Sequence, residues 1–138
     1  FDASEPGPPK HLHPNQDEFF EVISGRLDIF LYGKWQTLNA GEKIEIPRGT
    51  PHSLRNLHYE KCVFKNRHEP ALNFHEMMDE FHTITKEGRF NHKNPDFKSI
   101  STAANMWMRY PQDIRFASPP HTVAKIVAFI GRVLGVAK

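Results

Sequence analysis

The sequence predicts an all-β core of antiparallel strands, followed by two to three α-helices. Short segments rich in β-forming residues recur between turn signals up to about residue 66. After Pro70 the apolar residues recur at steps of three and four, which is the spacing of an amphipathic helix. The chain has 138 residues, which is the ordinary size of one domain that can bury a core.

The strands of the core are closely spaced and separated by turns. Residues 1–10 are rich in proline and glycine and can form an edge strand at best. Gly33-Lys34 occupies the position of a tight hairpin turn. We expect strands over residues 18–24, 26–32, 35–39, 43–47, 52–56 and 60–66. This spacing favours an antiparallel sandwich or barrel over a parallel sheet.

The second half of the chain is predicted to be helical. The first helix is expected to start near Phe74 and end near Gly88, and a second is expected around Trp107. Thr122 is the expected N-cap of a third helix that stops at Gly135. We therefore expect a β-barrel over residues 1–70 and a helical extension over residues 71–138. The two would form one structural domain, with the extension packed on the barrel or at a dimer interface.

The composition excludes several classes of partner. The net charge is only +2 and the basic residues are dispersed, so nothing indicates nucleic acid. The apolar run of the third helix is short and carries Lys125 and Arg132, which argues against a membrane span. Cys62 is the only cysteine, so there is no intrachain disulfide, and a cytoplasmic location is expected. The chain starts at Phe1 without a methionine, and we expect it to be a fragment of a longer product.

Four side chains have the chemistry and spacing of a metal site. His11 and His13 lie two residues apart and project to one face of an extended strand, and Glu18 opens the next strand. His52 starts a further strand after a Pro-x-Gly turn. Neutral imidazole and carboxylate together suit a first-row divalent ion. The alternative is a set of solvated surface residues, because the chain has nine histidines.

These stretches resemble the two signature motifs of the cupin superfamily. The first motif is matched by Gly7, His11, His13, Glu18 and Gly25, with the first glycine two positions closer than usual. The second is matched at every position by Gly41, Pro47, Gly49, His52 and Asn56. The resemblance implies a double-stranded β-helix, or jelly-roll barrel, with His11, His13, Glu18 and His52 as metal ligands. Small bacterial single-domain cupins with a helical C-terminal extension look similar. Because almost no strand precedes His11, the strands that complete the barrel would come from a removed N-terminus or from a partner subunit.

The resemblance also implies a function. Three imidazoles and one carboxylate leave one or two positions open on an octahedral ion, as a catalytic metal requires. The first hypothesis is a metal-dependent dioxygenase-like enzyme, similar to quercetinases, in which one Fe, Mn, Ni, Cu, Co or Zn ion acts on a small organic substrate. Glu18, if it detaches from the ion, could serve as general base. The alternative is a non-catalytic cupin that binds or senses a small molecule. A third and weaker hypothesis is a metal-free cupin similar to the sugar epimerases. Cupins are commonly homodimers, and a homodimer is expected.

The remaining expectations concern the pocket and the other histidines. Candidate lining residues of the pocket are Phe20, Ile29, Tyr32, Trp35, Ile46, Leu54 and Phe64, although period-2 alternation cannot say which face of a strand looks inward. Six histidines are expected on the surface or on helix faces: His58, His68, His75, His82, His92 and His121. Among these, only His58 is close enough to the second motif to suggest a supporting role at the metal site.

Overall fold

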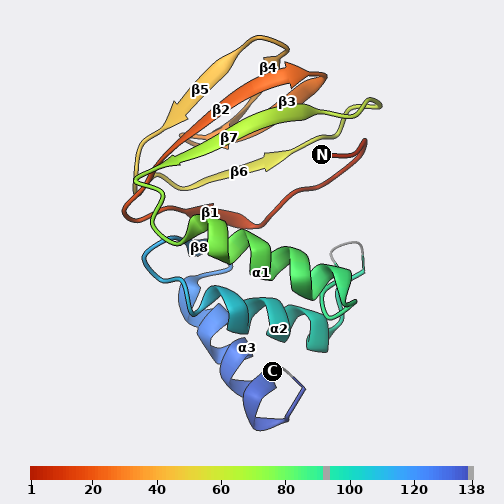
Figure 1. Cartoon of the computed structure of the whole chain (residues 1–138), viewed down its shortest axis with the longest axis vertical. Helices are drawn as coiled ribbons and strands as arrows, with labels where there is room; N and C mark the ends of the chain where they lie inside the picture. The colour runs from red at the N-terminus through yellow and green to blue at the C-terminus, as the bar shows by residue number, and fades with distance from the viewer. Residues whose placement is uncertain (92–93, 137–138) are drawn as a thin grey trace.

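The computed structural model describes residues 1–91 and 94–136, and Figure 1 shows the order of its elements. The expectation for His92 lies outside the described residues. The strands are β1 (Lys10–Leu12), β2 (Asp17–Ser24), β3 (Arg26–Leu31), β4 (Lys34–Asn39), β5 (Lys43–Ile46), β6 (His52–Arg55), β7 (Val63–Glu69) and β8 (Arg115–Ser118). The helices are α1 (Phe74–Lys86), α2 (Phe97–Trp107) and α3 (His121–Val133).

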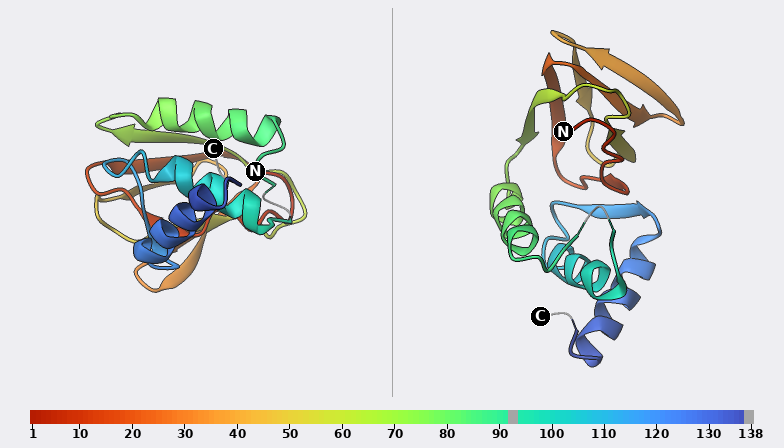
Figure 2. Two further views of the ribbon diagram at one scale, coloured as in Figure 1. Left: turned by 90° about the horizontal axis from the view of Figure 1, so that it is seen from below. Right: turned by 90° about the vertical axis from the view of Figure 1, so that its right-hand side faces the viewer.

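The strands form two sheets in which every pairing is antiparallel. One sheet has the order β4-β3-β6-β1-β8, and the other has the order β5-β2-β7. Figure 1 and the right-hand view of Figure 2 show the sheets above the helices, which gather at one end of the molecule. The predicted antiparallel core and its C-terminal helices are confirmed. Within the described residues, however, no hydrogen-bonded strand pair joins the two sheets, so they do not close into a barrel.

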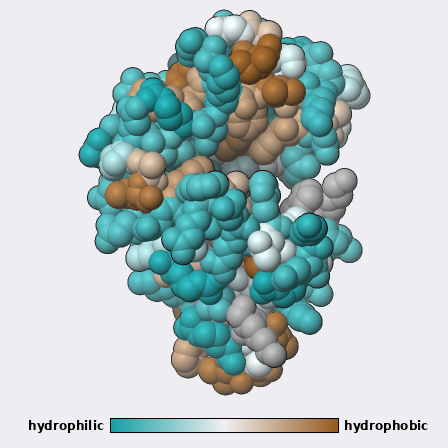
Figure 3. Space-filling view, viewed as in Figure 1, coloured by the Kyte–Doolittle hydropathy of each residue, from teal (hydrophilic) through white to brown (hydrophobic). Residues whose placement is uncertain are grey.

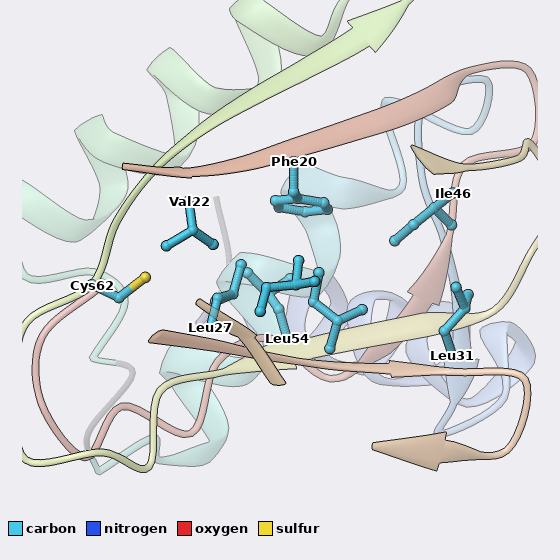
Figure 4. Packing of buried hydrophobic residues seen from close by; sticks show 9 residues of the cluster. Phe20, Val22, Leu27, Leu31, Ile46, Leu54 and Cys62 are labelled. Atoms are coloured by element: carbon cyan, nitrogen blue, oxygen red, sulfur yellow. The ribbon is translucent and has the colours of Figure 1, made fainter. Parts of the chain in front are cut away.

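The apolar core lies between the two sheets. Leu27, Ile29 and Leu31 alternate along β3 and belong to one buried cluster with Phe20 and Val22 of β2. Figure 4 shows Leu27 and Leu31 on the side of β3 that faces Phe20, Val22 and Ile46. Ile46, Leu54 and Cys62 complete the same cluster, and all of these side chains are buried. Fully burying one such aliphatic side chain contributes about 1.5–3 kcal/mol, so this cluster is what holds the sheets face to face.

Two of the predicted pocket residues do not face this interior. Tyr32 is 72% exposed at the β3–β4 turn, and Trp35 is 40% exposed. Trp35 pairs with Phe30, which alternates with the inward-facing Ile29, so both rings lie on the outer face of their sheet. The guanidinium of Arg55 stacks 3.7 Å from the Trp35 ring there. The alternation in the sequence predicted where the strands lie, but not which face of each strand points into the interior. Phe20, Ile29, Ile46 and Leu54 are buried, and Phe64 packs against the cluster partly exposed.

Two strands differ from the sequence prediction. β7 starts at Val63 and continues to Glu69, three residues further than expected. β8 was not predicted; it lies in the C-terminal half and pairs with β1, with His11 opposite Phe116. β8 therefore pairs with β1 at a position where we expected a strand from a removed N-terminus or from a partner subunit.

The helices form a second apolar cluster below the sheets. Met77 and Ile84 of α1 pack against Met106 of α2 and Tyr110. α1 spans nearly the predicted range, and α3 begins at His121 after Pro120, one residue before the expected cap Thr122. Among the described residues, no helix is long and apolar enough to cross a membrane. Figure 3 shows hydrophobic surface at the lower end of the molecule, over α3.

Candidate metal centre

The fold brings all four predicted ligands together in the space between the sheets. β1 holds His11 and leads into His13, β2 carries Glu18, and β6 starts with His52, which pairs directly with His11. The ligand atoms of His11, His13 and His52 lie within 4.8 Å of one another. Glu18 Oε2 lies 2.8 Å from His52 Nε2 and 3.6 Å from His13 Nε2. No more than 5% of any of the four residues is exposed.

Backbone carbonyls set the tautomer of the three imidazoles. The Nδ1 atoms of His11, His13 and His52 lie 2.9 Å, 2.6 Å and 3.0 Å from the carbonyl oxygens of Pro9, Asp113 and Thr50. A carbonyl oxygen can only accept a hydrogen bond, so each Nδ1 carries the proton and donates it. Each Nε2 therefore keeps its lone pair, and a metal-ligating histidine is typically oriented in this way.

The electrostatics of the site keep His11 and His13 neutral and the Glu18 carboxylate charged. Burial, with repulsion from His52 and His13, lowers the pKa of His11 to about 3. Burial also lowers the pKa of His13 to about 4, against the attraction of Glu18. Burial alone would raise the pKa of Glu18, but its contacts with His52 and His68 outweigh this and hold that pKa well below its usual value. At neutral pH, therefore, His11 and His13 offer uncharged nitrogen lone pairs beside the negative charge of Glu18.

Two atoms at the centre of the site lack a hydrogen-bond partner. Glu18 Oε2 and His52 Nε2 are buried, and the described residues supply no hydrogen bond to either. They lie only 2.8 Å apart, a distance at which two acceptors need a proton or a cation that both can bind. An unsatisfied buried polar group costs about 1–3 kcal/mol. A divalent cation between these atoms would satisfy both, and the donor set of three imidazoles and one carboxylate fits a first-row ion.

A fifth side chain at the site, His68, was missed from the sequence, and its expected surface position is wrong. His68 is buried on β7, where it pairs in register with Glu18. Its Nε2 lies 3.3 Å from both Glu18 Oε1 and His13 Nε2. With His13 and Glu18 it forms a second group whose ligand atoms lie within 4.8 Å of one another. The signal that could have found it is the alternation along β7, but the predicted strand ended at residue 66.

Four further histidines within the described residues are His58, His75, His82 and His121. His75 and His82 are exposed on α1, as expected, and His121 is partly buried at the start of α3. His58 lies 3.2 Å from Asp28, whose contacts with Thr37 and Arg55 connect the strands of the larger sheet. The charged partner of His58 is thus Asp28 and not Glu18.

The C-terminal half of the chain touches the site directly. The carbonyl of Asp113, in the loop before β8, orients His13 across 100 residues of sequence. Phe74, the first residue of α1, stacks on His68 with ring centres 3.6 Å apart. A surface hollow of about 630 Å³ lies elsewhere and contains none of the predicted pocket residues; it is lined by Met108, Pro111, Arg115, His121, Lys125 and Arg132.

Comparisons with known proteins place this geometry in a family. The sequence model of the cupin domain matches residues 1–66. Quercetin 2,3-dioxygenase of Bacillus subtilis (strain 168) is 40% identical over 47 residues, which are 34% of this chain and 14% of the relative. This chain therefore matches only a small part of that enzyme. Residues 1–66 therefore form a cupin domain.

Solved structures also match about half of this chain. Recombinant oxalate oxidase in complex with glycolate is 26% identical with a TM-score of 0.43, and the match covers 48% of this chain and 37% of that one. KdgF from Halomonas sp. is 26% identical with a TM-score of 0.43, over 48% of this chain and 59% of the other. Each match spans less than two thirds of the other chain.

Proposed function

We propose that this protein is a metal-dependent cupin enzyme of the dioxygenase type, with one divalent transition metal held by His11, His13, Glu18 and His52. The observation that supports it best is the convergence of three imidazoles and one charged carboxylate in a buried space. Two facing atoms of this set have no hydrogen-bond partner among the described residues. The local likeness to a quercetin dioxygenase supports the reaction class.

In this proposal the metal ion, the three histidines and Glu18 have different roles. When bound, the ion would polarise an enolate or catecholate oxygen of a small electron-rich substrate. His11, His13 and His52 are held by their carbonyl partners, so they can keep one geometry through the reaction. Glu18 Oε2 is the group that could accept a substrate proton, because it has no hydrogen bond to break among the described residues.

A second candidate is a cupin that binds a metal or small ligand without turnover. The low exposure of the four ligands favours this alternative, because a substrate could reach the ion only if covering residues moved. The large residues Phe20, Ile29, Ile46 and Leu54 also fill the space between the sheets. A measurement of turnover separates the two candidates.

Elemental analysis tests the proposal. The protein would be reconstituted separately with Fe, Mn, Co, Ni, Cu and Zn ions and desalted, beside a His13→Ala, His52→Ala double variant. His75→Ala is the matched control, because the His75 side chain is 91% exposed on α1. We expect about one ion per chain in the wild type and the control, and none in the double variant. Absence of metal from the wild type after every reconstitution would overturn the proposal.

Oxygen uptake by the loaded protein then tests the reaction class. Flavonols, enediols and catechols are the substrates to screen, since each offers an oxygen pair that an ion can polarise. Uptake that depends on both the substrate and the loaded site supports an enzyme. A fully loaded site with no uptake on any of the three classes favours the binding module.

We also propose that the chain forms a homodimer in the cytoplasm. α3 leaves a row of large apolar side chains exposed: Val123, Ile126, Phe129, Ile130, Val133 and Leu134. An exposed apolar stripe of this kind suits a subunit interface. Sedimentation equilibrium should give twice the chain mass, and a single-chain mass at tens of micromolar would contradict the dimer. The lone buried thiol of Cys62 is the basis for the location, which cell fractionation would test.

A further inference from the structure

The two oxygens of Glu18 have different surroundings. Oε1 accepts a hydrogen bond from Asn66 Nδ2 at 2.9 Å and lies 3.3 Å from His68 Nε2. Oε2 faces His52 Nε2 and has no hydrogen bond within the described part of the chain. Asn66 and His68 are two residues apart on β7, which pairs with β2 so that His68 is opposite Glu18. The edge strand β7 therefore contacts Oε1 of Glu18 through Asn66 and His68, while Oε2 faces His52.

The hydrogen-bond pattern fixes the role of the His68 ring. His13 donates its Nδ1 proton to Asp113, so its Nε2 is an acceptor. Glu18 Oε1 is also an acceptor, and His68 Nε2 lies 3.3 Å from both. Only a protonated Nε2 can make these contacts favourable, and its hydrogen bond to Glu18 Oε1 is the one that remains when an ion takes the lone pair of His13 Nε2. His68 thus presents a donor toward the site, whereas His11, His13 and His52 present lone pairs.

The position of His68 is set by the C-terminal half of the chain. Only 2% of its side chain is exposed. The Phe74 ring covers it with centres 3.6 Å apart and an interplanar angle of 24°, a stacked arrangement. Phe74 begins α1, so docking of this helix fixes the plane of the imidazole. Both residues lie beyond the segment that matches the cupin domain.

We propose that His68 is a positioning residue of the metal centre. It donates its Nε2 proton to Glu18 Oε1 and, with Asn66, holds the carboxylate so that Oε2 points at the ion. This inference rests on the proposed metal site but on no particular reaction. It predicts that the ion has three imidazole ligands, not four, although four histidines line the site.

Metal affinity of His68 variants tests this role. His68→Leu removes the donor, and His68→Gln keeps an N–H group at a similar distance. We expect His68→Leu to weaken Zn²⁺ binding by about 10- to 100-fold in a competition with a chelator, the range found for partners that orient metal ligands. His68→Gln should recover most of that loss. His58→Leu is the matched control, because His58 also contacts a carboxylate, Asp28, but on the outer face of the sheet.

The number of imidazole ligands provides a separate readout. Pulsed EPR or X-ray absorption of the Cu²⁺-loaded protein should show three imidazoles in both the wild type and His68→Leu. Four imidazoles that fall to three in His68→Leu would make His68 a ligand and overturn the proposal. Unchanged affinity in His68→Leu would also overturn it.

Two controls keep the outcomes distinguishable. If His68→Leu does not fold, His68→Phe replaces it, because it retains a ring to stack on Phe74 but has no N–H donor. If the wild type binds no metal, the proposed function itself fails. A wild type that binds metal and loses it in the His13→Ala, His52→Ala variant leaves the His68 result as a test of this inference alone.

Discussion

At the scale of single residues, two glycines of the cupin motifs have the same backbone conformation but different surroundings. Gly25 has a φ of +73° and Gly49 a φ of +75°, a region that L-residues with a Cβ rarely adopt. A Cβ on Gly25 would lie 2.4 Å from the carbonyl oxygen of Lys61, whereas a Cβ on Gly49 would have no heavy atom within 4 Å. The β2–β3 turn at Gly25 is therefore pressed against a second backbone segment.

This difference predicts unequal losses of stability. Gly49→Ala should lower the free energy of unfolding by about 1–2 kcal/mol, the cost of placing a Cβ in the left-handed region. Gly25→Ala should cost more than this, roughly 3 kcal/mol, because a backbone carbonyl cannot move aside as a flexible side chain can. Urea unfolding of both variants beside the wild type measures the two losses. Equal losses would show that the close contact with the Lys61 carbonyl does not add to the loss of stability.

The site residues show what sequence spacing can and cannot predict. The structure brings the predicted ligands His11, His13, Glu18 and His52 together, and the prediction rested on local features: their spacing, the neighbouring turns and the likeness to the cupin motifs. His68 was missed because its position depends on the register of β7 against β2, and nothing near it in the sequence fixes that register. The inward face of a strand likewise cannot be read from local sequence, so Tyr32 and Trp35 were predicted to line the pocket but are exposed.

At the scale of elements, Asp28 joins three strands on the outer face of the larger sheet. Its carboxylate accepts a hydrogen bond from Thr37 of β4 at 2.7 Å and contacts Arg55 of β6 at 3.3 Å and His58 at 3.2 Å. Burial alone would raise the pKa of Asp28, but these three contacts outweigh it and the pKa is lowered. The folded state therefore favours the charged carboxylate.

The lowered pKa of Asp28 predicts a stability that depends on pH. Because this pKa is lower in the folded chain than in the unfolded one, the carboxylate stabilises the fold fully above its ordinary value of 3.8. The stabilisation is lost as pH falls through the folded pKa. Asp28→Asn should cost about 1.5–3 kcal/mol at pH 7, the range for a hydrogen bond to a charged group, and much less at pH 2. Denaturant unfolding at both pH values checks this, and a loss independent of pH would contradict it.

The elements also differ in how far the sequence could predict them. The alternation along β3 and the helical spacing of α1 are local patterns, and both elements lie close to their predicted bounds. β8 has four residues, lies between proline-containing turns and pairs with a strand about a hundred residues earlier. A segment this short is stable only through that long-range pairing, so its own sequence carries little signal.

At the scale of the whole molecule, the candidate metal centre connects parts that are distant in sequence. His11 and His52 come from one sheet and Glu18 from the other. Beyond these, the carbonyl of Asp113 and the Phe74 ring bring in the C-terminal half. Because the sheets share no hydrogen-bonded strand pair among the described residues, an ion bound by both would add a direct connection between them.

Metal binding should therefore stabilise the entire fold. An ion that binds only the folded state at 100 times its Kd adds about 2.7 kcal/mol, which for a chain of this size raises Tm by roughly 10 °C. Differential scanning calorimetry with and without Zn²⁺ should show one transition that moves upward as a unit, and EDTA should reverse the shift. The His13→Ala, His52→Ala variant should show no shift. An equal shift in that variant would mean that the ion binds elsewhere, and a transition that splits in two would mean that the site does not couple the sheets to the helical half.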